Sequence, residues 1–382
     1  MKEQIPVNPD VLKWARTTMG LTENAVAKKL NKPIETIKDW ESGRTAPTYP
    51  ILERMAYELY KRPVAVFFFP CIPKEDGQKV DLRTLPDEII ETLPPEIIKM
   101  YRKAKLFQIN LTELYDGKKS VADDFLLKHK MSLSTDTKSL ARKLRSELDI
   151  TKATLSHWKN YDSAFEGWRN LLESRGVFVF KDSFKNDSYS GLCVFDENYP
   201  VIFINNSMPK SRQIFTIFHE LGHLLYRSGG IDFRSNDFNK QLKGEYSKIE
   251  IKCNRFAGEF LLPEFILNEE HLVLDEEFIS DLANRYKVSR EVVLRRYLDL
   301  HIIDKKAYEE FTSRWKVEFE KQKSAKSSGG DYYLTKMAYL GKTYINLAFS
   351  KYFQEKISIG GLADYLDIKV KNVPTFEGYF LR

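Results

Sequence analysis

Two histidines and a glutamate form the pattern with the clearest chemistry in this chain, in the run His219-Glu220-Leu-Gly-His223. The surrounding segment, Lys210–Tyr226, is apolar at helical spacing. Residues four apart on a helix share a face, so the two imidazoles can bind one metal ion, while Glu220 reaches a water molecule beside it. This pattern is typical of zinc hydrolases, in which Zn²⁺ lowers the pKa of water and the glutamate accepts the proton.

Catalytic zinc usually has three protein ligands, so a third must come from elsewhere in the chain. A polar loop over 228–248 leads into a second predicted helix, 247–262, on which Glu250 and Asn254 lie one turn apart. The carboxylate can approach a metal, and the amide can orient a histidine nitrogen. From spacing alone, a solvated helix carboxylate, one of several nearby, is the favoured interpretation of Glu250. Cys253 is a soft donor in principle, but its apolar neighbours favour buried packing.

Short β-branched and aromatic runs precede the motif helix and predict a small antiparallel sheet packed beside it. The runs are Val177–Phe180, Ser190–Phe195 and Val201–Ile204. Helices are predicted before them, at 88–114, 137–147 and 161–175. This order predicts an α+β domain. Residues 191–194 are a candidate edge strand, with which an extended substrate could pair.

Residues 8–70 have the pattern of a compact, all-helical module. Asn8-Pro9 begins one helix, Thr22 caps a second that runs to Leu30, and Pro33 begins a third through Trp40. A fourth helix is predicted through 51–59. Short helices joined by a tight turn predict a helix-turn-helix.

Two segments of this module resemble the phage-repressor (Cro/C1 or XRE) helix-turn-helix family. They are Gly20-Leu-Thr-x3-Val-Ala-x2-Leu30 and Ile37-x2-Trp40-Glu41-x-Gly43-x3-Pro47. The resemblance implies that Pro33–Trp40 is the recognition helix and that residues 8–48 bind DNA. The DNA-facing residues that it implies are Lys28, Ile34, Glu35, Thr36, Lys38 and Arg44.

The module also departs from that family. Glu23 stands where the family commonly has a glutamine that contacts DNA, and Glu35 and Asp39 on the recognition helix repel phosphate. A helix-turn-helix used for dimerisation or protein docking is therefore the alternative, and a homodimer stays open.

Three ordered motifs around the histidine pair resemble the ImmA/IrrE family of zinc peptidases. They are Pro200-Val-Ile-Phe-Ile-Asn205, Phe215-Thr-x2-His219-Glu-Leu-Gly-His223-Leu-Leu and Ile249-Glu250-x2-Cys253-Asn254-x-Phe256-Ala257-x3-Leu-Leu-Pro263. The resemblance, which covers residues 160–265, implies a zincin-like fold and a Zn²⁺ cofactor. It implies that His219, His223 and Glu250 are the zinc ligands, as in a gluzincin. It also implies that Glu220 is the catalytic base and that Asn254 supports a ligand histidine.

Other residues near the motif have weaker signals. Tyr246 and Tyr226 are candidates by position for stabilising a developing oxyanion, with structural packing as the alternative. The remaining histidines have no partner at ligand spacing and are interpreted as ordinary residues: His129, His157, His271 and His301. Residues 278–298 again have helix-turn-helix-like spacing, and packing against the peptidase is the favoured role.

The composition is that of an ordinary globular protein. The chain has 382 residues, of which 42% are hydrophobic and 30% charged, with a net charge of +6. It contains no apolar run of about 18 residues and no apolar signal core at its N-terminus. Its three cysteines are odd in number and widely spaced, which indicates reduced thiols. We therefore expect a cytoplasmic protein with no membrane partner.

We divide the chain into five segments. They are a helix-turn-helix DNA-binding domain (1–70), a linker and helical connecting region (71–160), a zinc metallopeptidase domain (161–270), a helical appendage (271–322) and a small helical C-terminal element (332–382). The first hypothesis is a DNA-associated intracellular zinc endopeptidase that cleaves a regulatory protein, such as a repressor encoded nearby. The alternative is a non-enzymatic transcriptional regulator or antitoxin-like binding protein with a structural zinc fold.

Overall fold

The computed structural model describes residues 7–73, 93–233, 244–323 and 330–381, apart from Gly20, Lys61 and His271. The chain divides into two compact units, Met1–Arg102 and Lys103–Arg382. Most of the predicted linker at the start of the 71–160 segment lies outside the described residues.

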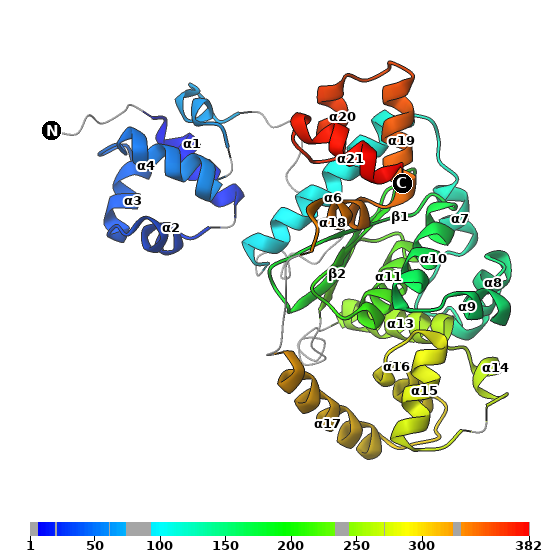
Figure 1. Ribbon diagram of the computed structural model, residues 1–382. Helices are drawn as coiled ribbons and strands as arrows, with labels where there is room; N and C mark the ends of the chain where they lie inside the picture. The colour runs from blue at the N-terminus through cyan, green and yellow to red at the C-terminus, as the bar shows by residue number, and fades with distance from the viewer. Residues whose placement is uncertain are drawn as a thin grey trace. The chain divides into compact units, whose positions relative to one another are not determined.

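The first unit is helical, as predicted (Figure 1). Its elements are α1 (Pro9–Thr18), α2 (Glu23–Leu30), α3 (Ile34–Glu41), α4 (Tyr49–Arg54), a π-helical turn (Met55–Tyr60) and a 3-10 helix (Val64–Phe68). The Asn8 side chain accepts a hydrogen bond from Asp10 N, and Thr22 Oγ1 accepts one from Ala25 N at 3.2 Å, so both predicted helix starts have caps. Ile37 of α3 is buried in the core of this unit.

The second unit is an α+β fold around a four-stranded sheet, which confirms the predicted fold class. Its strands are β1 (Phe178–Asp182), β2 (Tyr189–Val194), β3 (Val201–Asn205) and β4 (Gly230–Phe233). The helices up to the motif are α6 (Pro95–Leu114, which begins in the first unit), α7 (Ala122–Lys128), α8 (Thr137–Glu147), α9 (Lys152–His157), α10 (Tyr161–Glu173) and α11 (Lys210–Leu225). The helices that follow are α13 (Gly244–Leu261), α14 (Glu264–Leu267), α15 (Glu276–Tyr286), α16 (Arg290–Asp299) and α17 (Lys305–Lys323). The last are α18 (Tyr332–Leu340), α19 (Lys342–Phe353), α20 (Ile359–Tyr365), the 3-10 turn Val370–Asn372 and α21 (Val373–Phe380).

The strand pairing corrects two expectations. The strands lie in the order β1-β3-β2-β4, and β1 pairs in parallel with β3, so the sheet is mixed and not wholly antiparallel. Strand β2 pairs with β3 on one side and with β4 on the other, so residues 191–194 are interior and cannot be the edge that receives a substrate. Part of the predicted loop over 228–248 is in fact β4, and α13 begins at Gly244.

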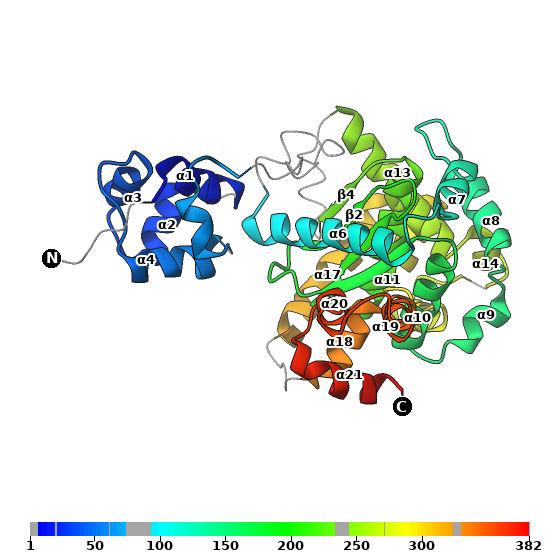
Figure 2. The ribbon, with the colours of Figure 1, turned by 90° about the horizontal axis from the view of Figure 1, so that it is seen from above.

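The two faces of the sheet carry different helices (Figure 2). Ile202 and Ile204 of β3 join the core formed with α10 and α11. Phe203 lies between them and points to the opposite face, since side chains alternate along a strand. There Phe107 of α6 stacks on Phe180 of β1, with ring centroids 4.3 Å apart. Strands β1 and β3 are therefore covered on both faces, which explains their nearly continuous apolar runs.

The C-terminal helices complete the α6 face of the sheet. Tyr344 of α19 is fully buried and packs edge-on against Phe107 and Phe180. Its hydroxyl accepts a hydrogen bond from Asn110 Nδ2 and donates one to Tyr365 O, both at 3.1 Å. The sequence gives no role for residues 332–382, and the structure shows that they close the core.

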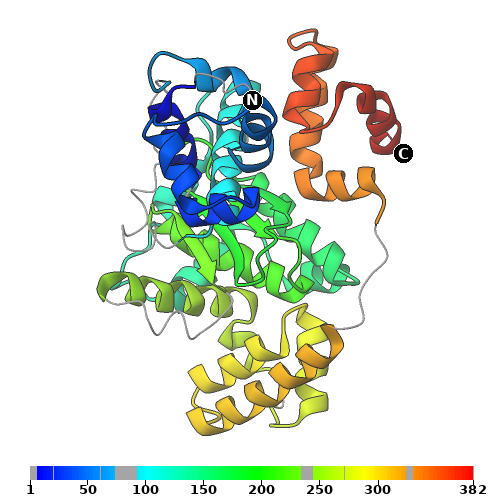
Figure 3. The same ribbon diagram turned by 90° about the vertical axis from the view of Figure 1, so that its left-hand side faces the viewer.

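Helices α15–α17 and α18–α21 lie at opposite ends of this unit (Figure 3).

The described residues include no helix that is both long enough and apolar enough to cross a membrane.

Candidate metal centre and nucleic-acid interface

Helix α11 places both motif histidines inside the second unit. His219 and His223 lie one turn apart and are fully buried. Gly222 lies between them, against α13, where an added Cβ atom would come 3.0 Å from Cys253 Sγ. Because Gly222 has no side chain, the two helices approach closely, and this approach brings Glu250 of α13 to the histidines.

The three predicted ligands converge on one point. His219 Nε2 and His223 Nε2 are 3.3 Å apart, and the Glu250 carboxylate oxygens lie 3.3 Å from the first and 3.0 Å from the second. Ligand atoms that bind a tetrahedral zinc ion at about 2.0–2.2 Å are about 3.3 Å from one another. The spacing of these three side chains therefore fits such an ion.

Glu220 lies beside this point without joining the ligand group. The ligand group consists of His219, His223 and Glu250, each of which offers one atom, and these atoms all lie within 4.8 Å of one another. Glu220 is fully buried, and neither of its carboxylate oxygens has a hydrogen-bond partner at ordinary geometry among the described residues, although the weakly donating Cys193 thiol lies near enough to act on it. A buried carboxylate with no partner is costly, and a water molecule next to a bound cation would satisfy it. The donor set and the orphaned oxygens together fit a Zn²⁺ site.

The charges at the site shift one another's pKa values. Burial opposes ionisation of Glu250, but the imidazoles of His223 and His219 outweigh burial and hold its pKa well below the usual range. Burial also disfavours protonated His219, yet Asp232 and Glu250 raise the pKa of that histidine to about 9. Burial raises the pKa of Glu220 to about 7. Glu250 is therefore ionised in a buried position, as cation binding requires.

An amide on α13 fixes the orientation of the first histidine. Asn254 Oδ1 lies 3.1 Å from His219 Nδ1. Because an amide oxygen only accepts, Nδ1 carries a proton and donates it, so Nε2 is the nitrogen that faces the ligand point and would bind a metal ion on losing its own proton.

A buried aspartate on β4, not identified by the sequence analysis, ties this strand to the motif helix. Asp232 accepts hydrogen bonds from both Arg212 Nη2 (2.8 Å) and Thr216 Oγ1 (2.9 Å) of α11. Arg212 also donates to Ser190 Oγ of β2 at 3.1 Å. Strand β4 is only four residues long and has no recognisable periodicity, so the sequence alone suggested a loop.

Gly230 brings the same strand directly against the site. A Cβ atom added at Gly230 would lie 2.5 Å from the His223 ring and 3.0 Å from Glu220 Oε2. Only glycine fits here without displacing His223 or Glu220. The pair Gly229-Gly230 after the motif helix was the available sequence signal for this close approach.

The other candidate ligands lie elsewhere. Cys253 is buried in the apolar core against Gly222 and is not part of the ligand group. His129 is buried and pairs with Glu147 at 3.0 Å. His271 lies outside the described residues.

The predicted DNA-facing residues lie on α2, on α3 and in the turn after α3. Lys28, Ile34, Glu35 and Arg44 are exposed, and Thr36 and Lys38 are half-buried.

The basic groups on and after the recognition helix are already paired within this unit. Lys38 Nζ lies 2.8 Å from Glu35 Oε1, and Arg44 Nη2 lies 2.9 Å from Asp39 Oδ1. Lys28 has no ion pair with any residue that the structure describes. A phosphate would therefore meet Lys28 directly, whereas Lys38 and Arg44 must exchange partners first.

The second helix-turn-helix-like segment packs inward. Half of the residues of α16 are buried, and Arg296 donates to Leu262 O at 3.0 Å and pairs with Glu259 of α13. This helix therefore supports the end of α13 and presents no broad face to a nucleic acid.

Comparisons with known proteins find two families. Residues 172–298 match a metallopeptidase family described as the IrrE N-terminal-like domain, and residues 12–57 match a helix-turn-helix family. The radiation response metalloprotease IrrE of Deinococcus radiodurans is 34% identical over 104 residues, which are 26% of this chain and 31% of that protein. The chain thus matches less than a third of that relative's length. No solved structure matches the chain.

Proposed function

We propose that this chain, in which an IrrE-like metallopeptidase domain follows an XRE-type helix-turn-helix domain, is a zinc-dependent endopeptidase that cleaves a regulatory protein. A transcriptional repressor encoded nearby is the substrate class that best suits a peptidase attached to a DNA-binding domain. Such an enzyme would work in the cytoplasm.

The proposed roles follow from the geometry of the buried site. His219, His223 and Glu250 would hold Zn²⁺, which when bound polarises a peptide carbonyl and acidifies water. Asn254 keeps His219 in the tautomer that a ligand needs. Glu220, with a pKa raised to about 7 by burial, accepts a proton from the attacking water and returns it to the leaving nitrogen.

The substrate would lie along β4. This strand is at one end of the described sheet, and its outer backbone edge has no partner strand among the described residues. An extended peptide can add to such an edge through main-chain hydrogen bonds. Because Gly230 packs against Glu220 and His223, a peptide on this edge would pass beside both residues.

The observation that carries the proposal is the convergence of three buried ligand atoms beside an unpartnered glutamate. The test is Glu220→Gln. Because Glu220 is not in the ligand group, we expect the variant to retain about one zinc per chain and to lose cleavage by about 100-fold or more. New protein N-termini, identified by mass spectrometry in cells that make the wild type and absent with the variant, would also identify the substrate.

The matched control is Glu245→Gln, which neutralises an exposed carboxylate on the same helix as Glu250. It should leave both zinc content and cleavage unchanged. If Glu220→Gln keeps full biological activity with zinc bound, the non-enzymatic regulator becomes the better reading.

We further propose that residues 8–48 bind DNA through α3, with Lys28, Ile34, Glu35, Thr36, Lys38 and Arg44 at the interface. Affinity for duplex DNA, measured by anisotropy at several salt concentrations, should fall with a slope of about 0.9 per neutralised phosphate. Lys28→Ala should reduce the slope by about one. Lys119→Ala, an exposed lysine of the other unit, is the control, and equal slopes for both variants would contradict the proposal.

A further inference from the structure

A tyrosine on α13 stands next to the ligand group. Tyr246 lies one helical turn before Glu250, and its ring stacks on the His223 imidazole with centroids 6.2 Å apart and an interplanar angle of 23°. The ring is thus held against one ligand and on the same helix as another.

The hydroxyl of this tyrosine is buried and has no hydrogen-bond partner among the described residues. A buried tyrosine hydroxyl ordinarily finds a partner, because leaving it unpaired in the protein interior is costly. The carboxylate of Glu250 nevertheless lies near enough to act on the hydroxyl. A tyrosine hydroxyl is protonated at neutral pH, so this group can donate a hydrogen bond to an oxygen in the site.

The second candidate, Tyr226, differs in its surroundings. Its hydroxyl also has no partner, but it follows the last residue of α11, and the groups that add to burial in raising its pKa are Cys253 and Glu245. Neither the base nor a ligand acts on it. Arg212 is a further donor near the site, yet it is bound to Asp232 and Ser190.

We propose that Tyr246 is a catalytic residue whose hydroxyl donates a hydrogen bond to the carbonyl oxygen of the scissile peptide as negative charge develops there. The proposal rests on the peptidase function proposed above. Its physical basis is that a preorganised donor in a water-poor site stabilises such charge more than it stabilises the neutral substrate. The hydrogen bond should therefore raise kcat and leave the affinity for the substrate unchanged.

The test compares Tyr246→Phe with Tyr226→Phe, which removes an equally unpartnered hydroxyl. Kinetics are measured on a protein whose cleavage depends on Glu220. Tyr246→Phe should lower kcat by about 100-fold with KM, zinc content and melting temperature unchanged. Tyr226→Phe should leave all four quantities unchanged.

A second readout does not depend on turnover. Acetohydroxamate, whose oxygens can accept from a tyrosine, should bind zinc-loaded Tyr246→Phe about ten-fold more weakly than the wild type by calorimetry, whereas azide should bind both equally. Unchanged kcat and hydroxamate affinity, or a fall in zinc content or melting temperature that accounts for the lost activity, would overturn the proposal. If the wild type cleaves nothing and only the hydroxamate result holds, Tyr246 keeps its donor role and the peptidase function fails.

Discussion

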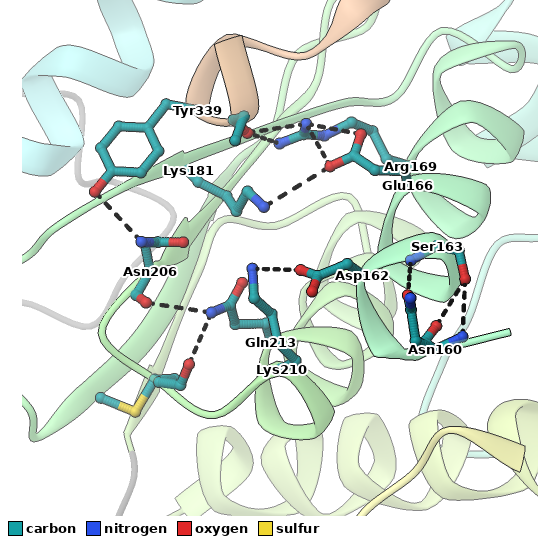
Figure 4. A network of polar contacts seen from close by, with 12 residues as sticks. Asn160, Asp162, Ser163, Glu166, Arg169, Lys181, Asn206, Lys210, Gln213 and Tyr339 are labelled. Atoms are coloured by element: carbon teal, nitrogen blue, oxygen red, sulfur yellow. Dashed lines mark hydrogen bonds and ion pairs between the residues drawn. The ribbon is translucent and has the colours of Figure 1, made fainter. Parts of the chain in front are cut away.

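Two buried polar clusters in the second unit look alike at first and differ in what they can do. One is the candidate metal centre, formed by His219, His223 and Glu250 with Glu220 beside them. The other, the α10 cluster, comprises buried Arg169, Glu173 and Lys181 with half-buried Glu166. Figure 4 shows Glu166, Arg169 and Lys181 between α10, β1 and α18.

Both clusters contain strongly shifted pKa values. In the α10 cluster, burial raises the pKa of Glu173 to about 7. Burial, together with the neighbouring charge of Arg169, lowers the pKa of Lys181 to about 7 as well. A perturbed pKa therefore does not by itself distinguish a functional site from a structural one.

The arrangement of the donor atoms is what separates them. At the metal centre, three ligand atoms converge on one point. In the α10 cluster the contacts are spread over separate partners: Arg169 donates to Glu166 at 3.2 Å and to Ala338 O of α18 at 3.1 Å, and Lys181 Nζ lies 4.0 Å from the centroid of the Phe165 ring. The first arrangement suits a cation, and the second joins secondary-structure elements.

The largest effect that this comparison predicts is at the metal centre. His223→Ala removes one of three ligands, and we expect zinc to fall from about one per chain to nearly none, with cleavage lost. Metal analysis of the purified protein checks this. His129→Ala removes a buried histidine outside the ligand group and should keep the zinc. Equal zinc content in both variants would show that His223 is not a zinc ligand, and the two clusters would then no longer differ in function.

The opposite outcome is expected for the α10 cluster. Arg169→Met leaves Ala338 O without its charged donor, so the free energy of unfolding should fall by about 2–4 kcal/mol, while zinc content stays near one per chain. Urea denaturation and metal analysis measure the two quantities. Arg142→Met, at an exposed position of α8, should change neither. Loss of zinc in Arg169→Met would show that the clusters are coupled.

Much of the metal centre could be predicted because its residues repeat at helical spacing. His219 and His223 are four apart on one helix, as are Glu250 and Asn254 on the next. Asp232 could not be predicted, because its four-residue strand forms only by pairing with β2.

The sequence also could not predict that β1 pairs in parallel with β3, or that Tyr344 packs on Phe107. Both depend on contacts between distant parts of the chain, which local patterns do not encode. The sequence therefore predicted the α+β class, but the predicted antiparallel sheet was wrong for the pair β1 and β3, and the order of the strands was not predicted.

A smaller effect at the metal centre tests how its ligands are supported. Asn254→Ala removes the acceptor for His219 Nδ1, and zinc affinity should fall by about 10–100-fold. Competition with a chelator measures the affinity. Asn254→Asp retains an acceptor oxygen and should bind zinc more tightly than Asn254→Ala. If the two variants bind zinc equally, orientation of His219 contributes nothing.

The smallest effect returns to the α10 cluster and depends on pH. The pKa of Glu173 is raised in the folded protein to about 7 from an ordinary value of about 4.5, so the folded state binds more protons between these values. The stability that protonated Glu173 gives to the folded protein is therefore lost as the pH rises from about 4.5 to about 7. Glu173→Gln, which stays neutral, should stabilise the protein by about 1–2 kcal/mol at pH 8 relative to wild type, and by much less at pH 5. Thermal unfolding should show the melting temperature rising by about 2–4 °C for each kcal/mol of added stability. An equal rise at pH 5 and pH 8 would show that the charge of Glu173 does not destabilise the folded protein.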